Sequence, residues 1–265
     1  MSIVELPIKL NVPASSQKPE NNGSKTDALI AHEKILVIIP AYNESGNIQR
    51  TIQEVLALSF GVTALVIDDG SLDATAAVAK KAGARVISLP FNLGIGGAVQ
   101  TGFQYALKAG FTIAVQVDGD GQHDVSCLKN LLEPVVEKKA DMTIGSRFIP
   151  PYVGYRSSFV RRIGINFFAR LISFLTGCKV TDPTSGFRAF NFKLIKAFAA
   201  HYPHDFPEPE AIVVAKRLRT EVLEVPVKMR KREHGDSSIR YLRTLYYMIK
   251  VTFAILLDML KQKEK

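Results

Sequence analysis

Apolar and polar positions alternate in a regular way along the chain up to residue 146. Short, almost uninterrupted apolar runs are typical of buried parallel strands, and they occur at 35–40, 64–68, 85–89, 111–118 and 141–145. The segments between them place apolar residues three and four apart, which predicts helices over 47–58, 73–81, 96–108 and 125–137. Strands and helices in alternation predict an α/β fold with a mostly parallel central sheet, right-handed crossovers and helices on both faces.

The pattern changes after Arg147. It predicts a helix over 159–176, a turn and strand over 181–190, a helix over 209–218, a strand over 221–229 and a closing amphipathic helix over 238–263. The longest uncharged run of that helix, 251–257, has seven residues, whereas a membrane span needs about twenty. The helix therefore packs on the domain, lies in a membrane interface or pairs with a second copy of the chain.

Residues 1–33 differ from the rest in carrying Pro13, Pro19 and a polar run over 20–24, with little periodic pattern. The predicted organisation is therefore a mobile arm over 1–33, a single folded domain over 34–235 and a C-terminal amphipathic helix over 236–265.

The charge is strongly positive. The formal net charge is +9, and the excess gathers in 147–170 and 216–243. Without a nucleic-acid-binding motif, this favours phosphorylated substrates or an anionic membrane surface and excludes a nucleic-acid partner. Two cysteines, Cys127 and Cys178, match no metal or redox spacing, which favours a reducing, cytoplasmic compartment, on the cytosolic face of a membrane if one is contacted.

Acidic residues follow three of the predicted strands. Asp118 and Asp120 lie one residue apart in a glycine-rich turn, where their carboxylates suit Mg²⁺ or Mn²⁺ shared with a diphosphate. Tyr42 follows the first strand and can stack on a base, and Asp69 follows the second and can accept a hydrogen bond from uracil or guanine. Because the carboxyl ends of parallel strands meet at one edge, these residues are expected to share a cleft.

A series of ordered motifs resembles a known family. The motifs IPAYNE, VIDDGSLDAT, NLGIGGA, QVDGDGQH, IGSRF and TDPTSGFRAF are similar to those of the family-two inverting glycosyltransferases with the GT-A, or nucleotide-diphospho-sugar transferase, fold. The resemblance is strongest to the branch of dolichyl-phosphate mannose synthase and the polyprenyl-phosphate glycosyltransferases, and it covers about 35–240.

The resemblance implies roles for individual residues. It places Pro40, Tyr42 and Glu44 in the nucleotide pocket with Asp69 reading the base, and it makes Asp118, Asp120 and Gln122 the metal site. It places Arg147 near phosphate, and Arg232 on a loop that closes over the diphosphate. Arg162 and Asn166 match a pair that holds the acceptor phosphate, although the family has Ser where this chain has Asn166.

The glycine-rich run at 92–98 is not a dinucleotide fingerprint, because residue 99 is Val where a third glycine is needed. Small residues such as Gly96 are expected to let the backbone approach the donor. A sugar hydroxyl as acceptor would need a catalytic base, and the candidates are Asp182, Glu208 and Glu210, whereas an anionic phosphate would need none.

These observations predict a metal-dependent inverting glycosyltransferase. It would take a nucleoside-diphosphate sugar, a UDP-sugar in preference to GDP-mannose, and transfer the sugar to a polyprenyl phosphate. The alternative acceptor is a saccharide hydroxyl during surface polysaccharide synthesis. A sugar nucleotidyltransferase is disfavoured because the loop after the first strand, at 40–47, contains no basic residue, and a non-catalytic sugar-binding protein is disfavoured by the acidic pair.

Overall fold

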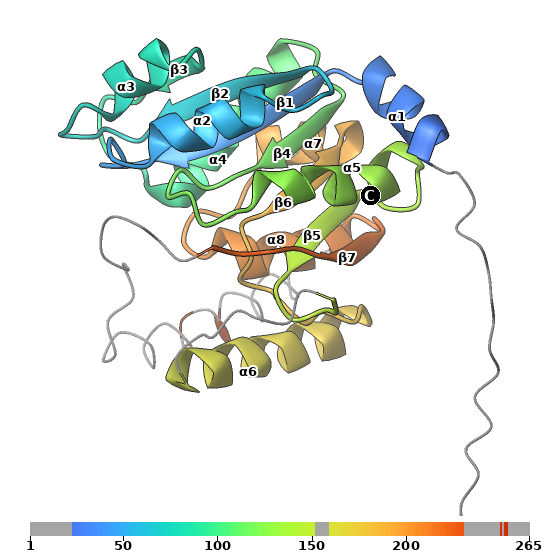
Figure 1. Ribbon diagram of the computed structural model, residues 1–265. Coiled ribbons are helices and arrows are strands. Elements are labelled where there is room, and N and C mark those ends of the chain that lie inside the picture. The colour runs from blue at the N-terminus through green and yellow to red at the C-terminus, as the bar shows by residue number, and fades with distance from the viewer. Residues whose placement is uncertain (1–22, 152–158, 231–249, 251, 254–265) are drawn as a thin grey trace, which may run out of the picture.

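The computed structural model describes residues 23–151, 159–230, 250 and 252–253. One seven-stranded sheet forms its centre, in the order β3-β2-β1-β4-β6-β5-β7 (Figure 1). The strands are β1 (Ile35–Ala41), β2 (Val62–Asp68), β3 (Arg85–Ser88), β4 (Ile113–Gln116), β5 (Met142–Ser146), β6 (Arg188–Asn191) and β7 (Val222–Pro226). β6 is antiparallel to its neighbours β4 and β5, and the other pairings are parallel, so the predicted mostly parallel sheet is confirmed.

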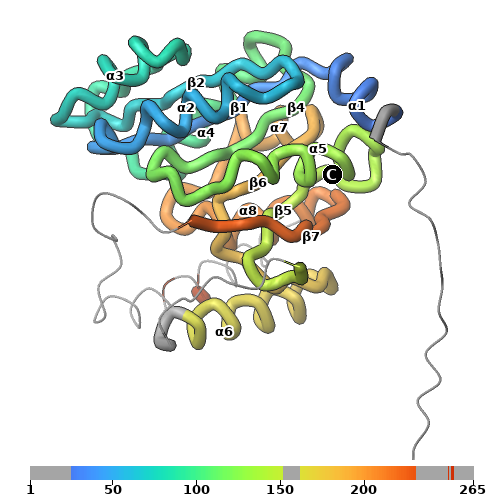
Figure 2. The backbone as a smooth tube through the Cα atoms, in the orientation of Figure 1, coloured from blue at the N-terminus to red at the C-terminus, as the bar shows by residue number. Residues whose placement is uncertain are grey.

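Helices cover both faces of the sheet, as predicted. Strand β1 shows the division most clearly, because Leu36 and Ile38 face one apolar cluster while Val37 and Ile39 face the other. The first cluster includes α4 (Gly94–Lys108), α7 (Phe192–Ala200) and α8 (Pro207–Arg217). The second includes α2 (Ile48–Leu56), α3 (Thr75–Lys81), the short 3₁₀ turn η1 (Val125–Cys127) and α5 (Leu128–Val136). Helix α6 (Phe159–Thr176) packs on α8 and lies apart from the sheet (Figure 2).

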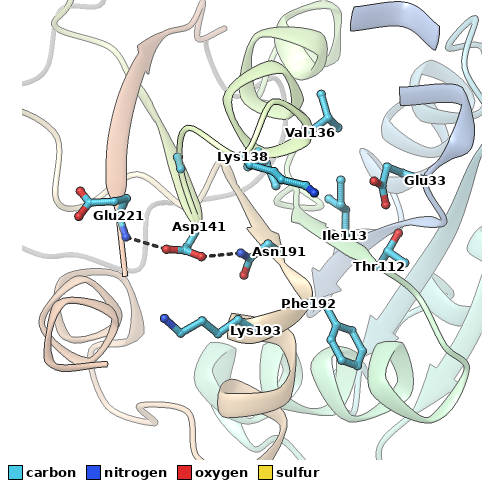
Figure 3. Close-up of a pocket in the computed structure, with 12 residues that line it drawn as sticks. Glu33, Thr112, Ile113, Val136, Lys138, Asp141, Asn191, Phe192, Lys193 and Glu221 are labelled. Atoms are coloured by element: carbon cyan, nitrogen blue, oxygen red, sulfur yellow. Dashed lines mark hydrogen bonds between the residues drawn. The ribbon is translucent and has the colours of Figure 1, made fainter. Parts of the chain in front are cut away.

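Asp141 ties three strands together at the amino-terminal edge of β5. Its carboxylate accepts hydrogen bonds from the Asn191 side-chain amide at 2.6 Å and from the Glu221 backbone N–H at 2.8 Å. These contacts border a surface hollow of about 400 Å³ (Figure 3). The hollow therefore lies at the edge of the sheet opposite to the strand ends that carry Asp118 and Asp69.

Two helices were not expected from the apolar spacing. α1 (Gly23–His32) lies within the segment predicted to be an arm, and it packs on α5 through Ile30, with Asp27 2.5 Å from the Lys129 ammonium. Its single buried aliphatic position produces too weak a periodic signal to predict the helix. α7 begins at Phe192 and is capped by Asn191, whose side-chain oxygen accepts from the Leu194 N–H at 3.1 Å. That N-cap followed by apolar residues was an available signal.

Several predictions fall on residues outside the described part of the chain. They concern the arm over 1–22, the loop that carries Arg232 and most of the closing helix over 238–263. Of that helix, Lys250 is described, and its ammonium lies 3.2 Å from the Asp205 carboxylate and over the Phe206 ring, just before α8. Among the described residues, no helix combines the length and the apolar character needed to cross a membrane.

Candidate active site

The carboxylate of Asp118 lies just beyond the end of β4, in the centre of the sheet. Its side chain is 31% exposed, and its Oδ1 lies 3.3 Å from the Gln116 side-chain amide, which donates to it. Gly186 passes directly beside it, because a Cβ at position 186 would lie only 2.9 Å from either carboxylate oxygen. The glycine at position 186 therefore leaves room for the Asp118 carboxylate, which remains partly exposed to solvent.

His123 fixes the backbone and the carboxylate of Asp118. Its Nδ1 accepts a hydrogen bond from the Asp118 N–H at 3.0 Å, which in a neutral ring leaves the proton on Nε2, 3.6 Å from Asp118 Oδ2. The imidazole is buried and stacked on Phe187, with centroids 4.8 Å apart. The ring therefore supports Asp118.

Asp120 and Gln122 form a tight turn beside Asp118. Asp120 Oδ1 accepts from the Gln122 N–H at 3.0 Å, and the Gln122 side chain donates to the Arg230 carbonyl at 3.5 Å. The two carboxylates fit Mg²⁺ or Mn²⁺, which are often held by one or two carboxylates with substrate phosphates completing the ligand set. Within the described ranges, no three His, Cys, Asp or Glu side chains gather as a metal site, so such an ion would need ligands beyond Asp118 and Asp120.

Some of the residues predicted to bind the nucleotide already take part in local hydrogen bonds or in a strand. Tyr42 is 44% exposed after β1, as a stacking residue requires. Glu44 accepts from the Asn47 side-chain amide at 2.7 Å, and Pro40 lies within β1. Asp69 is only 4% exposed, and its Oδ1 accepts from the Leu93 N–H at 2.7 Å. Burial raises the pKa of Asp69, although hydrogen bonds from the backbone of Leu93 and Gly94 oppose the increase.

Asp69 therefore holds the start of α4 against the end of β2, with one oxygen already engaged. Gly96 has a similar structural use. A Cβ at position 96 would lie 2.5 Å from the carbonyl oxygens of Pro203 and His204, so only glycine lets α4 approach that backbone. This packing reason explains the glycine, and the approach of the donor at Gly96 stays a prediction.

Arg147 and Asp182 form a buried ion pair. The Asp182 carboxylate accepts from the Arg147 backbone N–H at 3.1 Å, from Nε at 2.6 Å and from Nη2 at 2.5 Å. Asp182 is fully buried and Arg147 nearly so. In this geometry both carboxylate oxygens of Asp182 accept hydrogen bonds from Arg147, and the Arg147 guanidinium is engaged with a carboxylate where a phosphate was expected.

Phe148 connects this pair to α6. The guanidinium carbon of Arg162 lies 3.8 Å from the centre of the Phe148 ring, and that of Arg147 lies 5.6 Å from it. Asn166 lies one turn along α6 from Arg162, and both are exposed. The two predicted acceptor residues are therefore together and accessible, and Arg147 is next to them.

The two candidate bases on α8 differ in environment. Glu210 is buried in the first turn of α8, whereas Glu208 is half-buried. Burial raises the pKa of Glu208, the nearby Arg188 opposes this, and the negative charge of Asp118 adds to the increase. Glu208 is thus within electrostatic reach of the predicted metal carboxylate. Arg188 had been assigned no role, although it belongs to the quoted motif at 181–190.

Comparison with known proteins decides the family. A model described as glycosyl transferase family 2 matches residues 36–198. The chain belongs to this family. The protein is therefore an enzyme that transfers a sugar, and the resemblance inferred from the motifs is confirmed.

Relatives in the family carry more specific names. UDP-N-acetylglucosamine–dolichyl-phosphate N-acetylglucosaminyltransferase of Methanococcus voltae is 30% identical over 219 residues, covering 75% of this chain and 86% of the relative. Polyprenol monophosphomannose synthase of Mycolicibacterium smegmatis is 31% identical over 194 residues, covering 71% and 72%. Both names agree with the branch that the sequence resembles.

A solved structure shows the same fold. Glucosyl-3-phosphoglycerate synthase from Mycobacterium tuberculosis, in complex with Mn²⁺, UDP and glucosyl-3-phosphoglycerate, superposes with a TM-score of 0.67 at 22% identity, covering 92% of this chain and 85% of that one. The predicted GT-A fold of this glycosyltransferase is thereby confirmed.

Proposed function

We propose that this glycosyltransferase moves a sugar, with inversion, from a nucleoside-diphosphate sugar to a polyprenyl phosphate in a metal-dependent reaction. The observation that carries the proposal is the open Asp118 carboxylate at the end of β4, held by Gln116 and His123 beside Asp120. The names of the relatives support the acceptor, and the Mn²⁺ and UDP of the structural neighbour support the cofactor and a UDP-sugar over GDP-mannose.

In the reaction, a phosphate oxygen of the acceptor attacks the anomeric carbon while the bond from that carbon to the diphosphate breaks. Asp118 and Asp120 would hold the cation, which when bound neutralises the charge developing on the diphosphate. Tyr42 would stack on the base, and Asp69 would accept a hydrogen bond from it. The acceptor is already anionic, so the reaction needs no base, and the commitment of Asp182 to Arg147 agrees with this.

Helix α6 suits a lipid acceptor. Ile163, Phe167 and Phe174 are exposed at positions that share one face of α6, and Phe174 is 85% exposed. Arg162 and Asn166 lie alongside this apolar face. We infer that α6 rests on the anionic cytosolic face of a membrane, with its apolar residues toward the lipid and Arg162 on the acceptor phosphate.

A donor and acceptor screen tests the proposal. The purified protein is incubated with UDP-glucose, UDP-N-acetylglucosamine or GDP-mannose, with or without undecaprenyl phosphate, in Mn²⁺, Mg²⁺ or EDTA. Release of nucleoside diphosphate and formation of a glycosyl lipid are measured. We expect transfer that needs the lipid phosphate and stops in EDTA. Full turnover in EDTA would contradict the metal assignment.

The role of Arg162 has a matched control on the same helix. Arg162→Ala removes a guanidinium able to form charge-assisted hydrogen bonds to phosphate, which are worth about 1.5–3 kcal/mol, so lipid transfer should fall by roughly 10- to 150-fold in kcat/KM. Arg170→Ala removes an equally exposed arginine from α6 and should change transfer little. Equal losses in the two variants would show that general charge, and no specific phosphate contact, is what matters.

A saccharide hydroxyl is the second candidate acceptor, because Glu208 is near Asp118 and has a raised pKa, as a catalytic base would. Transfer to a free saccharide, absent with undecaprenyl phosphate and abolished in Glu208→Gln, would favour this alternative.

A further inference from the structure

Arg188 is an unusual residue in the core of the sheet. It begins β6 and is completely buried, and burial lowers the pKa of its guanidinium. Nε donates to the Ser185 carbonyl at 2.7 Å and Nη2 to the Pro183 carbonyl at 3.0 Å, but Nη1 has no hydrogen-bond partner among the described residues. Because a buried charge with an unused donor is costly, local packing alone does not explain this arginine.

Within the part of the chain that the structure describes, the acidic residues around Arg188 form no salt bridge with it. Asp182 is occupied by Arg147, and Glu224 accepts from the backbone N–H groups of Thr181 and Asp182 at 2.7–2.9 Å. Glu208 acts on Arg188 only through its electrostatic field. The positive charge of Arg188 is therefore not paired with one carboxylate, and its electrostatic field acts on several neighbouring groups.

Gln116 lies directly opposite Arg188 in the β4–β6 pairing. Opposed residues of an antiparallel pair project to the same face with Cβ atoms about 5 Å apart. Gln116 is also buried, its Nε2 donates to Asp118 Oδ1, and its Oε1 has no hydrogen-bond partner in the described ranges. The amide thus has a guanidinium across the strand pair and a carboxylate at its donor end. The electrostatic field of the guanidinium and the carboxylate favours the amide orientation in which Nε2 points toward Asp118.

We propose that Arg188 is a positioning residue for the metal–diphosphate site: it orients Gln116, which holds Asp118, and it supplies a fixed positive charge beneath the paired carboxylates. This inference rests on the proposed function, since it concerns the same ion. Two carboxylates and a diphosphate repel one another even around a divalent cation, and a buried, unpaired guanidinium reduces that repulsion without competing for ligands.

Binding of MnCl₂ in the presence of UDP tests the inference without turnover. Free Mn²⁺ is counted by electron paramagnetic resonance in the wild type, Gln116→Leu, Arg188→Gln and Arg188→Lys. The control is Arg85→Gln, which changes an exposed arginine that begins another strand. We expect Mn²⁺ affinity about tenfold weaker in Gln116→Leu and Arg188→Gln, which corresponds to loss of one charge-assisted contact. Arg188→Lys should recover most of it, and the control should match the wild type.

Stability separates positioning from a structural role. Gln116→Leu removes a buried acceptor that has no partner among the described residues, which offsets the loss of its hydrogen bond to the part-exposed Asp118. Its melting temperature should therefore change little while its Mn²⁺ affinity falls. Mn²⁺ affinity within about twofold of wild type in folded Gln116→Leu and Arg188→Gln would overturn the inference. If Arg188→Gln does not fold, Gln116→Leu decides alone. A wild type that binds neither Mn²⁺ nor UDP would overturn the proposed function, and the inference with it.

Discussion

Removing the carboxylate of Asp182 should destabilise the fold far more than it changes the chemistry. Asp182→Ala leaves the Arg147 guanidinium, which is 3% exposed, without the carboxylate that accepts two of its hydrogen bonds and a third from the Arg147 backbone N–H. The guanidinium also donates to the Thr184 hydroxyl at 2.9 Å, which carries no charge. The variant therefore removes the negative charge paired with a buried guanidinium.

The size of the effect follows from that burial. Breaking a buried ion pair by removing one partner costs about 3–5 kcal/mol. For a domain of this size each kcal/mol lowers the melting temperature by about 2–4 °C, so the predicted decrease is roughly 6–20 °C. The double variant Arg147→Met/Asp182→Leu removes both charges, and it should lose less stability than Asp182→Ala.

Urea and thermal unfolding followed by circular dichroism at pH 7 measure these changes, and donor hydrolysis is assayed on the same samples. We expect residual activity in Asp182→Ala at low temperature, in proportion to the folded fraction. A variant that melts within about 2 °C of the wild type and yet turns over no donor would refute this reasoning. Asp182 would then be the catalytic base that the motif also allowed.

Three further outcomes are expected. Asp120→Asn should abolish Mn²⁺-dependent activity and weaken Mn²⁺ binding by calorimetry, with the apo melting temperature nearly unchanged. Gly186→Ala places a methyl group 2.9 Å from the Asp118 oxygens, so it should weaken Mn²⁺ binding measured in the same way. Burial raises the pKa of Glu208 above its usual 4.5, so the ionised form disfavours folding. Glu208→Gln should therefore raise the melting temperature at pH 7, and this gain should shrink as the pH falls and vanish below about 4.5. An unchanged difference across that range would contradict the pKa shift.

The parts of the fold that the sequence predicted are those with strong local signals. β1 and β2 read as apolar runs because both of their faces are buried, and α4 shows its period over fifteen residues. The direction of β6 was not predictable in this way, since it depends on pairing with β4 and β5 far away in the chain. α1 was missed because one buried position, Ile30, carries most of its packing.

In the candidate site, too, some features could be predicted from local sequence signals and others could not. Carboxylates at strand ends, such as Asp118, could be placed because parallel strands deliver their ends to one edge. The partners of polar side chains could not. Whether Asp69 faces a base or the N–H of Leu93, and whether Arg147 meets a phosphate or Asp182, depends on contacts between loops that no local pattern encodes. Arg188 lay within a recognised motif, but its burial was visible only in three dimensions.

The position of β6 has a consequence for synthesis of the chain. β4 and β5 follow one another in sequence but are not neighbours in the sheet, because β6 lies between them and bonds to both. A nascent chain that has emerged only through residue 187 thus holds β1 to β4 as one unit, with β5 unpaired. At about 5–20 residues per second, tens of residues beyond β5 must be made before that edge is covered. Until then, the edges of β4 and β5 that β6 will pair are open for a chaperone, or a neighbouring nascent chain, to bind.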